Sequence, residues 1–592
     1  MTPPQKANPR IHLRHLDSVG HLGKARLAAL LLAAGIGVGL PAHRWAQDNS
    51  RSSYDLLIVH GRIIDGSGSP WFAGSVAVKD GRIADVGRLP GATAKRVIDA
   101  SGLVVVPGFI DLHSHSDYTL LVDGTVQSKI RQGVTTEILG EAASAGPILA
   151  PAFADFDNGT APLTEKDGLK RDWTTLGEYF ARAERQGISV NIASYVGSGQ
   201  VRLDVMGNVN RAPTTAELEQ MKGLVDQSMR DGAIGVASGL IYAPNMFART
   251  SELIDLAREA AKYGGLYTTH IRGEGANSVE AIRETIEIAE KAGLPAHILH
   301  FKSNGQANWG RMPELIRVIQ EARDRGLDVT ADQYPYLAGM TSLEQCLPPK
   351  YLEGTADDVV ARLKNPEARA EIRQAIERGL PGWDNNEVKD CGGWHGVMLA
   401  SCRLPENKRY EGKRLDEVAH LMGKDPVDAL CDLLIAEHAT PMAIYFSMSE
   451  ADVEAAMKQP WVGIGSDGAA VNPSMAFMGR PHPRFYGTFP RVLGVYVRER
   501  HVLTLPDAIR KMTSLSAEIT GLTDRGLLRP GMAADITTFD PATVRDEATF
   551  EDPAQYPRGI PYVIVNGVVV IDQGRHTGAK PGRVLFGRGR RK

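Results

Sequence analysis

Cysteine is scarce in this sequence. Its 592 residues include four cysteines, all in one stretch of the second half: Cys346, Cys391, Cys402 and Cys431. No two of them form a Cys-x-x-Cys pair, and a structural zinc site needs such closely spaced ligands. We therefore expect ordinary thiols, with one disulfide left open.

Neither sign of charge dominates. The formal net charge is −3, with 67 basic and 70 acidic residues, and 43% of the residues are hydrophobic. Such a composition is typical of a soluble globular protein. It gives no electrostatic reason for nucleic acid or an anionic membrane to be the main partner. We expect a small-molecule substrate, no nucleic acid partner and no integral membrane domain in the mature chain; the oligomeric state is left open.

Long apolar runs are also rare. The run LAALLLAAGIGVGL, at residues 27–40, is preceded by basic residues and followed by small ones, which is the pattern of a secretory signal. It is shorter than the roughly 20 residues of a membrane-spanning helix. Residues 1–50 are therefore predicted to be a signal or targeting segment, and the protein to be periplasmic or secreted. A mis-assigned start with a cytoplasmic protein, or an uncleaved anchor, stays open.

Short alternating strands separated by turns occupy residues 54–106, where KDGR contains an Asp-Gly hairpin signal. A matching pattern returns in GMAADITTFD and YVIVNGVVVIDQGR, with Asn-Gly as the turn. The two ends, residues 54–106 and 526–585, are therefore predicted to pair into one small β-sandwich outside the main domain.

Residues 107–525 alternate strand-like apolar runs with amphipathic helical patterns. Eight runs have the character of strands: GFIDLHSH, VTTEILGE, ISVNIASYVG, AIGVASGL, GLYTTHIR, AHILHFK, LDVTADQYPY and WVGIGSDG. Eight such units predict an α/β protein with a TIM-like (β/α)8 barrel. The gap between the last two runs is too long for one helix, so an inserted lid subdomain is predicted at about residues 337–455.

Side chains that bind metals or move protons stand at the ends of these predicted strands. His113 and His115 end the first strand and, with a period of two, point the same way. The ends of strands two, five, six and eight carry Glu141, His270, His300 and Asp467. Because the carboxyl ends of barrel strands meet on one face, the six groups should lie together. His297 falls on the opposite face of strand six from His300 and is interpreted as structural.

The chemistry of the six groups points to metal-assisted hydrolysis. Imidazoles and carboxylates suit zinc in an open catalytic site, where the ion lowers the pKa of a bound water. Asp467 is then the candidate to take a proton from that water and pass it to a leaving amine.

The strand ends also carry a family resemblance. The segments GFIDLHSHSD, GVTTEILGE, ASGLIYAP, THIRGEG, HFKSNG, DQYPY, GSDG and HPRFYGTFPRVL are similar to those of the amidohydrolase superfamily. Within it, the chain resembles the N-acyl-D-amino-acid deacylase (D-aminoacylase) group from about residue 54 to 585. The resemblance implies a metal-dependent TIM-like barrel beside a small β-sandwich. It also implies a zinc-dependent hydrolase that cleaves N-acyl-D-amino acids to a D-amino acid and a carboxylate.

The resemblance implies roles for the six strand-end groups. His113 and His115 would bind the first metal position, and His270 and His300 the tighter zinc, with Asp467 as general base and then acid. D-aminoacylases have a metal-binding cysteine after strand two, whereas the turn here reads GEAASAG. Glu141 is therefore the predicted substitute ligand, able to bridge, and the number of zinc ions is one or two.

The substrate carboxylate is expected to be held by a cation and hydroxyl groups near the strand ends. The positions that the resemblance implies for substrate binding are Lys302, Tyr242, Tyr334 and Arg272. For Arg272, a structural role is an equally weighted alternative. Ser198 stands where D-aminoacylases often have a histidine, so substrate choice is expected to differ from theirs.

Two other functions stay open. One is an amidohydrolase of another type, acting on a cyclic amide, as hydantoinases and dihydroorotases do, or on a small dipeptide. Those relatives usually bring a lysine into the metal bridge, and no lysine stands at the corresponding strand end here. The other is a non-catalytic binding protein on a barrel scaffold, against which the retention of all six groups argues.

Overall fold

The computed structural model describes residues 53–475 and 479–590. The predicted signal segment, residues 1–50, lies outside this range. Among the described residues, no helix combines the length and the apolar character needed to cross a membrane.

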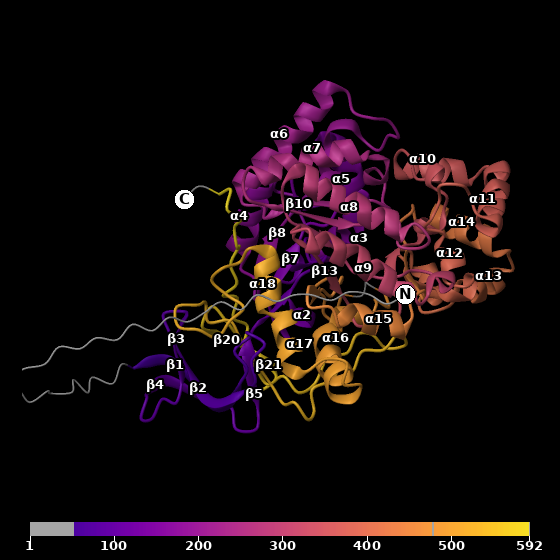
Figure 1. The fold of residues 1–592 in the computed structure, drawn as a ribbon. Helices are drawn as coiled ribbons and strands as arrows, with labels where there is room; N and C mark the ends of the chain where they lie inside the picture. The colour runs from indigo at the N-terminus through magenta and orange to yellow at the C-terminus, as the bar shows by residue number, and fades with distance from the viewer. Residues whose placement is uncertain (1–52, 476–478, 591–592) are drawn as a thin grey trace, which may run out of the picture. The chain divides into compact units, whose positions relative to one another are not determined.

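Within the described residues, eight parallel strands form the centre of the fold (Figure 1). In order around the barrel they are β6 (Phe109–Asp111), β7 (Val134–Leu139), β8 (Asn191–Ser194) continued by β9 (Val196–Gly197), β10 (Gly235–Gly239), β11 (Leu266–His270), β12 (Ala296–Ile298), β13 (Val329–Gln333) and β17 (Val462–Ile464). The circle closes because Asp467 N donates to His113 O at 2.8 Å and His115 N to Gly468 O at 3.1 Å. The predicted (β/α)8 barrel is confirmed.

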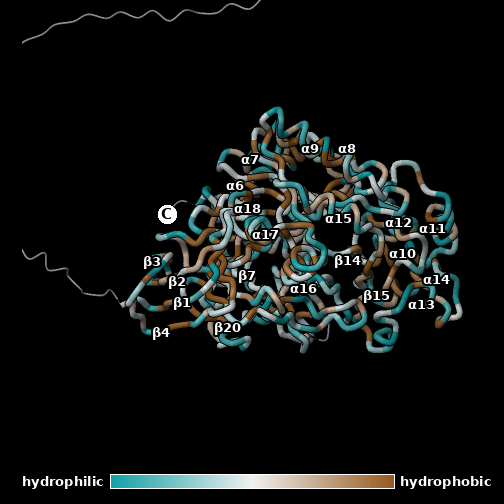
Figure 2. The backbone as a smooth tube through the Cα atoms, turned by 60° about the horizontal axis from the view of Figure 1, so that its bottom comes forward, coloured by the Kyte–Doolittle hydropathy of each residue, from teal (hydrophilic) through white to brown (hydrophobic). Residues whose placement is uncertain are grey.

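The barrel strands are buried on both faces, as parallel strands between a filled interior and an outer helix layer must be. Every residue of β7 and β11 is buried. The outer helices include α6 (Thr215–Asp231), α7 (Thr250–Ala261), α8 (Ser278–Ala292) and α9 (Met312–Asp324). In Figure 2 the hydrophobic segments gather in the interior and the hydrophilic ones along the outer turns.

Helix α6 shows how the sequence sets the ends of these helices. Its N-cap Thr214 accepts from Glu217 N, and the Glu217 side chain accepts from Thr214 N, which together make a capping box. It ends at Gly232, whose φ of 117° is accessible to glycine but strained for other residues. The cap and the glycine thus fix the length of the helix between two barrel strands.

A separate subdomain, residues 339–445, is inserted between β13 and β17. Its strands β14 (Gly339–Ser342), β16 (Met442–Tyr445) and β15 (Val397–Ser401) form an antiparallel sheet in that order. Helices α10 (Ala356–Leu363), α11 (Pro366–Arg378), α12 (Glu387–Asp390), α13 (Leu415–Met422) and α14 (Pro426–Ala436) gather together in Figure 1. The four cysteines are free and buried in the core of this subdomain.

The helix α15 (Glu450–Met457) lies inside the predicted insertion but belongs to the barrel. It packs against α9, β13 and β17, which places it in the outer helix layer. The extra elements therefore end with β16.

Both ends of the described chain contribute to one nine-stranded sheet outside the barrel. Its strands are β1 (Tyr54–Ile63), β2 (Phe72–Lys79), β3 (Arg82–Gly87), β4 (Ala94–Asp99), β5 (Val104–Pro107), β18 (Ile536–Phe539), β19 (Tyr562–Val565), β20 (Val568–Asp572) and β21 (Arg575–His576). The two ends meet where β5 pairs antiparallel with β18. They share one core, so the predicted pairing of the ends is confirmed, as a continuous sheet.

Asn191 joins this sheet to the barrel. It begins β8, and its buried amide Nδ2 donates to Thr135 O at 3.0 Å and to Asp535 Oδ2 at 3.1 Å. Its Oδ1 accepts from Asn566 Nδ2 at 2.7 Å and from Arg583 N at 3.1 Å. Asn566 is the asparagine of the predicted Asn-Gly turn, so this turn is fixed against the barrel wall.

We predict that Asn191→Ala lowers the free energy of unfolding by about 1–3 kcal/mol, because it removes the four hydrogen bonds that join β8 to Thr135, Asp535, Asn566 and Arg583. Chemical denaturation followed by circular dichroism measures the change. Asn210→Ala, at an exposed asparagine, is the control and should leave the midpoint unchanged. Equal midpoints for the two variants would contradict this account of the junction.

Candidate metal centre and active site

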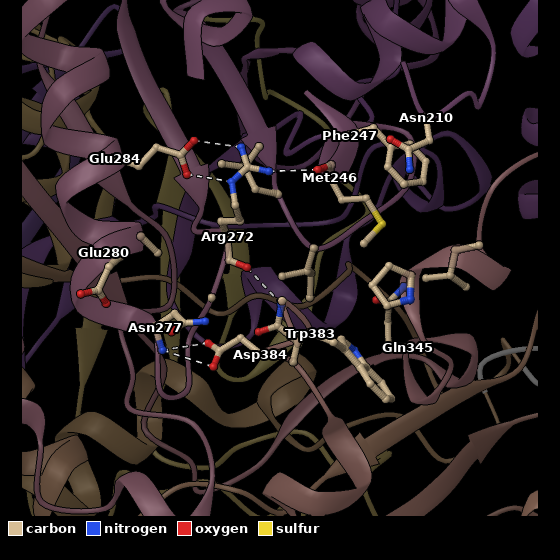
Figure 3. A pocket seen from close by; sticks show the side chains of 18 of the residues that line it. Asn210, Met246, Phe247, Arg272, Asn277, Glu280, Glu284, Gln345, Trp383 and Asp384 are labelled. Atoms are coloured by element: carbon tan, nitrogen blue, oxygen red, sulfur yellow. Dashed lines mark hydrogen bonds and ion pairs between the residues drawn. The ribbon is translucent and has the colours of Figure 1, made fainter. Parts of the chain in front are cut away.

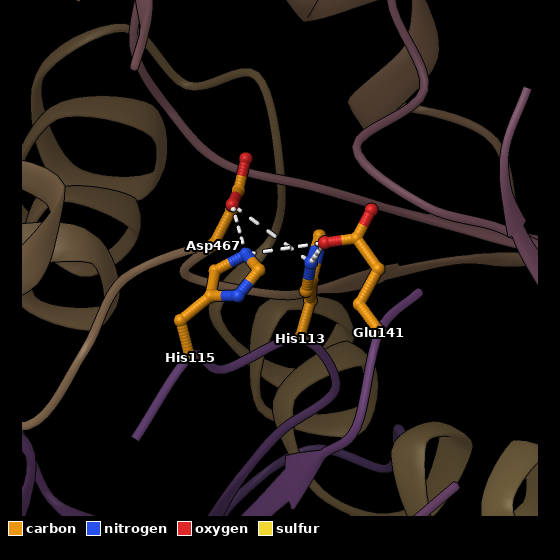
Figure 4. Close-up of side chains that lie close together, drawn as sticks. All are labelled: His113, His115, Glu141 and Asp467. Atoms are coloured by element: carbon orange, nitrogen blue, oxygen red, sulfur yellow. Dashed lines mark hydrogen bonds and ion pairs between the residues drawn. The ribbon is translucent and has the colours of Figure 1, made fainter. Parts of the chain in front are cut away.

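The structure brings the six strand-end groups together at one mouth of the barrel. All except His115 are buried, and the side chain of His115 is 45% exposed. Figure 4 shows four of them, His113, His115, Glu141 and Asp467, converging on one point. The carboxyl ends of five different strands thus supply one site, as the barrel topology requires.

Glu141 lies between two pairs of histidines. Its Oε2 is 2.8 Å from His113 Nε2 and 3.1 Å from His115 Nε2. Its Oε1 is 3.7 Å from His270 Nδ1 and 4.0 Å from His300 Nε2. One carboxylate oxygen therefore faces each pair, which is the placement of a bridging ligand.

The ligand-type atoms form two clusters that share Glu141. The first cluster contains His113, His115, Glu141 and Asp467, and the second contains Glu141, His270 and His300. Within each, the atoms lie within 4.8 Å of one another. We call them the first and the second cluster below.

Unpartnered polar atoms indicate that the second cluster is built for a cation. Glu141 Oε1 and both ring nitrogens of His270 are buried and have no hydrogen-bond partner among the residues that the structure describes. Leaving a buried polar atom unsatisfied costs about 1–3 kcal/mol, so such atoms need an explanation. A divalent ion bound by imidazole nitrogens and a carboxylate oxygen supplies one, and this donor set fits zinc.

Arg484 is a buried residue of the site to which the sequence analysis gave no role. It begins α16 (Arg484–Arg491), and its Nη1 lies 2.9 Å from Asp467 Oδ2. Burial acts to raise the pKa of the Asp467 carboxyl, but Arg484, His113 and His115 outweigh it and hold that pKa well below its usual range. The segment HPRFYGTFPRVL carries an arginine in an apolar run, which is the sequence signal that it could be buried and paired.

Glu274 was also missed. It follows β11 in the segment THIRGEG and is buried. Its Oε1 accepts from Lys302 Nζ at 2.5 Å and lies 3.1 Å from His300 Nδ1. Burial acts to raise the pKa of Glu274, but Lys302, His270 and His300 together hold it below its usual range. Lys302 Nζ also lies 2.7 Å from His300 Nδ1, so these two charged groups together fix the His300 ring with Nε2 on the side of Glu141.

Comparison with known proteins places the chain in a family. The amidohydrolase family matches residues 96–571. The chain belongs to this family.

Relatives within it are deacylases. The chain is 38% identical over 534 residues to a D-aminoacylase of Alcaligenes xylosoxydans xylosoxydans, which covers 90% of this chain and 97% of that protein. A crystal structure of the N-acyl-D-glutamate deacylase of Bordetella bronchiseptica, complexed with zinc and a phosphonate inhibitor, is 32% identical with a TM-score of 0.75 and covers 90% of this chain and all of that one. A D-aminoacylase structure with a binuclear metal centre is 35% identical, with the same TM-score and coverage.

The two tyrosines predicted to bind substrate in this amidohydrolase both lie beside the clusters. The Tyr242 ring is 5.2 Å from the His270 ring, and the Tyr334 ring is 6.4 Å from the His300 ring. Two cations face Tyr334, with Arg484 at 4.7 Å and Lys302 at 5.9 Å from its ring centre. These side chains therefore border the two clusters.

Arg272 lies apart from the clusters. Its Nε and Nη2 donate to the Glu284 carboxylate at 2.9 Å, and its Nη1 donates to Met246 O at 2.9 Å. It lines a cavity of about 450 Å³ between the barrel and the inserted subdomain, which Figure 3 shows with Glu284 and Asp384. These contacts favour a structural role for Arg272 over the binding of substrate.

His297 lies on the inner face of the barrel wall, because its partners Thr330 and Asp332 alternate along β13 with Val329 and Ala331, which pack against the outer helices. The prediction that it occupies the opposite face is therefore wrong. His297 is fully buried, with Nδ1 2.8 Å from Thr330 Oγ1 and Nε2 2.9 Å from Asp332 Oδ2, so it takes no part in either cluster. This placement agrees with its interpretation as a structural histidine.

We predict that Glu141→Gln weakens zinc binding at both clusters, because one of its oxygens faces each of them. The loss should exceed the roughly 10–100-fold that removal of an outer hydrogen-bond partner costs. Titration with zinc in competition with a chromophoric chelator measures it. His297→Asn, at a buried histidine outside the clusters, is the control. Equal zinc affinity of the two variants would count against Glu141 as a ligand.

Proposed function

We propose that this protein hydrolyses the amide bond of N-acyl-D-amino acids and releases a D-amino acid and a carboxylate. The observation that carries the proposal is the placement of Glu141 between two histidine pairs, with Asp467 beside one of them. The similarity to D-aminoacylase over 97% of that protein supports the substrate class.

The clusters fit one or two zinc ions, held by His113 and His115, by His270 and His300, and by Glu141 between them. When bound, zinc polarises the substrate carbonyl and lowers the pKa of water to around 7.

Asp467 is placed to move the proton of the reaction. Its Oδ1 lies 3.0 Å from His115 Nε2, and Arg484 keeps the carboxyl ionised and able to accept. Hydrolysis adds the hydroxyl of water to the acyl carbon and a proton to the amide nitrogen. Asp467 takes that proton from the attacking water and delivers it to the nitrogen as the C–N bond breaks.

The substrate carboxylate binds at the cationic side of the site. Arg484 and Lys302 flank the Tyr334 ring, and the buried Nε of Arg484 has no hydrogen-bond partner in the structure. A carboxylate beside the guanidinium would accept from this nitrogen, with the hydroxyl groups of Tyr334 and Tyr242 close by. Anchoring at this end sets the amide bond over the metal clusters.

The residue that lies between the two histidine pairs distinguishes this site from the one expected of an enzyme that acts on cyclic amides. This residue is Glu141, while Lys302 lies outside the pairs, bonded to Glu274 and to His300 Nδ1. The site thus departs from the lysine-bridged pattern expected of hydantoinase-like enzymes.

We also propose that the protein is exported to the periplasm or beyond. The basic N-terminal residues followed by the apolar run at 27–40 support this. Fractionation of cells that produce the full chain, with N-terminal sequencing of the mature protein, tests it; an intact N-terminus in the cytoplasm would reject it.

The first functional prediction is that zinc-loaded protein releases free amino acid from N-acetyl-D-amino acids and not from their L-enantiomers. A panel of both enantiomers, with hydantoin and dihydroorotate included, measures the specificity. Chelation should abolish turnover and added zinc should restore it. Turnover of the cyclic amides alone would replace the proposal with the alternative enzyme, and activity indifferent to chelator would reject a metal hydrolase.

The second is that Asp467→Asn lowers kcat by about 10²–10⁴-fold, because an amide cannot accept the proton. The second cluster, which excludes Asp467, should retain its zinc affinity. Asp452→Asn, at a buried aspartate of α15, is the matched control and should keep wild-type turnover. Near wild-type turnover in Asp467→Asn would remove Asp467 from its role.

A further inference from the structure

A fully buried lysine lies beneath the first cluster. Lys129 belongs to the short helix α2 (Gln127–Ile130), and its side chain has no exposed surface. Lysine is almost never fully buried unless it is paired, so its partners indicate what it does.

The ammonium of Lys129 donates to three groups at once. Nζ lies 2.8 Å from Asp111 Oδ2, 2.5 Å from Ser466 Oγ and 2.7 Å from Gly468 O. Ser466 and Gly468 stand immediately before and after Asp467. One side chain therefore binds the residues on both sides of the proposed general base, Ser466 through its hydroxyl and Gly468 through its carbonyl.

The same group reaches the end of the first barrel strand. Lys129 Nζ is 3.3 Å from Ser114 Oγ, and Ser114 is the residue between His113 and His115. Asp111 completes the link, because its Oδ1 accepts from Ser466 N at 2.7 Å and from His113 N at 3.3 Å. The ammonium thus ties together the two chain segments that supply His113, His115 and Asp467.

The segment that it holds has an uncommon conformation. Asp467 has φ of 50°, in the left-handed region that residues other than glycine seldom adopt. Such a conformation persists only where the surroundings fix it. The bonds of Lys129 and Asp111 to the neighbours of Asp467 provide that restraint.

The charge of Lys129 is balanced locally. Asp111 lies at 2.8 Å and Glu137 Oε1 at 3.4 Å, and both carboxylates are fully buried. Ser114 and Ser116 donate to Glu137 Oε1 at 2.7 Å, which connects the Ser114 loop to this charge cluster. Lys129, Asp111 and Glu137 contact the segments around the site and make no bond to the ring nitrogens of His113 and His115.

We propose that Lys129 is a positioning residue: by binding Ser466, Gly468 and Asp111 it fixes the left-handed backbone of Asp467 and the separation of Asp467 from His113 and His115. This inference rests on the role proposed for Asp467. This role explains why a lysine is buried at position 129, where an apolar side chain of similar size could fill the same space.

The test compares two buried lysines. Lys511, on α17 (Leu505–Met512), is also fully buried, and it donates to the carbonyls of Gln459 and Val462, before and at the start of β17 and away from the clusters. Lys129→Met and Lys511→Met each remove one buried ammonium and keep an unbranched apolar stem. Both should lower the melting temperature, so stability alone does not decide the question.

Three readouts separate the variants. Lys129→Met should lower kcat by about 10–100-fold with KM changed less than about threefold, and weaken zinc binding by a similar factor. Hydrogen exchange should accelerate in the peptide covering residues 465–470 and stay unchanged at 296–302. Lys511→Met should show none of these changes. The proposal is overturned if Lys129→Met matches Lys511→Met in turnover, zinc affinity and exchange.

If Lys129→Met does not fold, the variant Ser466→Ala tests the same proposal. It keeps the buried ion pair of Lys129 with Asp111. It removes a hydroxyl that accepts from Lys129 Nζ and Gly468 N and that donates to Asp111 Oδ2 and His113 O. A drop in kcat of about 10-fold with faster exchange at 465–470 supports the proposal, and wild-type values for both reject it. Wild-type protein that lacks deacylase activity would refute the proposed function, while exchange and zinc affinity would still decide the role of Lys129.

Discussion

The site depends on the electrostatic attraction between the buried Glu141 carboxylate and the four histidines around it, which solvent does not screen. In water, one carboxylate among four imidazoles would gain little, because solvent screens the attraction. At the mouth of this barrel the group is buried, its two oxygens face different histidine pairs, and one of those oxygens has no partner. Each surrounding charge is paired in turn: Asp467 with Arg484 and Glu274 with Lys302. A cation between the histidine pairs would satisfy the unpartnered Glu141 oxygen, and the ion pairs of Asp467 and Glu274 hold the side chains around it.

The strand periodicity of the sequence predicted much of this arrangement. Because barrel strands end on one face, residues such as His270 and His300 could be placed from the ends of apolar runs alone. The same rule gave the wrong face for His297, because β12 ends at Ile298 and its alternation does not continue to His300. Arg484, Glu274 and Lys129 could not be placed in this way. They lie on a helix or a loop, and their partners are up to hundreds of residues away in the chain, so only the tertiary packing brings them to the site.

The outer sheet and the inserted subdomain also differ in how far the sequence could predict them. The pairing of the chain ends followed from two matching hairpin patterns, and β5 pairs with β18 as those patterns require. The interior of the inserted subdomain could not be derived, because its short helices carry no signal that fixes which faces meet. The predicted end of the insertion was too late because α15 has little amphipathic pattern that would mark it as an outer barrel helix. Only its packing against β13 and β17 shows that it belongs to the barrel.

The partners of Asn191 have a consequence for how the chain acquires its fold. Strand β8 is bonded to Arg583 and Leu585, and the Asn191 side chain to Asn566, all of which follow it by more than 370 residues. A ribosome must synthesise almost the entire chain before these contacts can form, although the last barrel strand ends at Ile464. Contacts of such long range make folding slow and late. A chain cut short before residue 566 would therefore keep every barrel strand and still lose these hydrogen bonds, which hold β8 from outside the barrel.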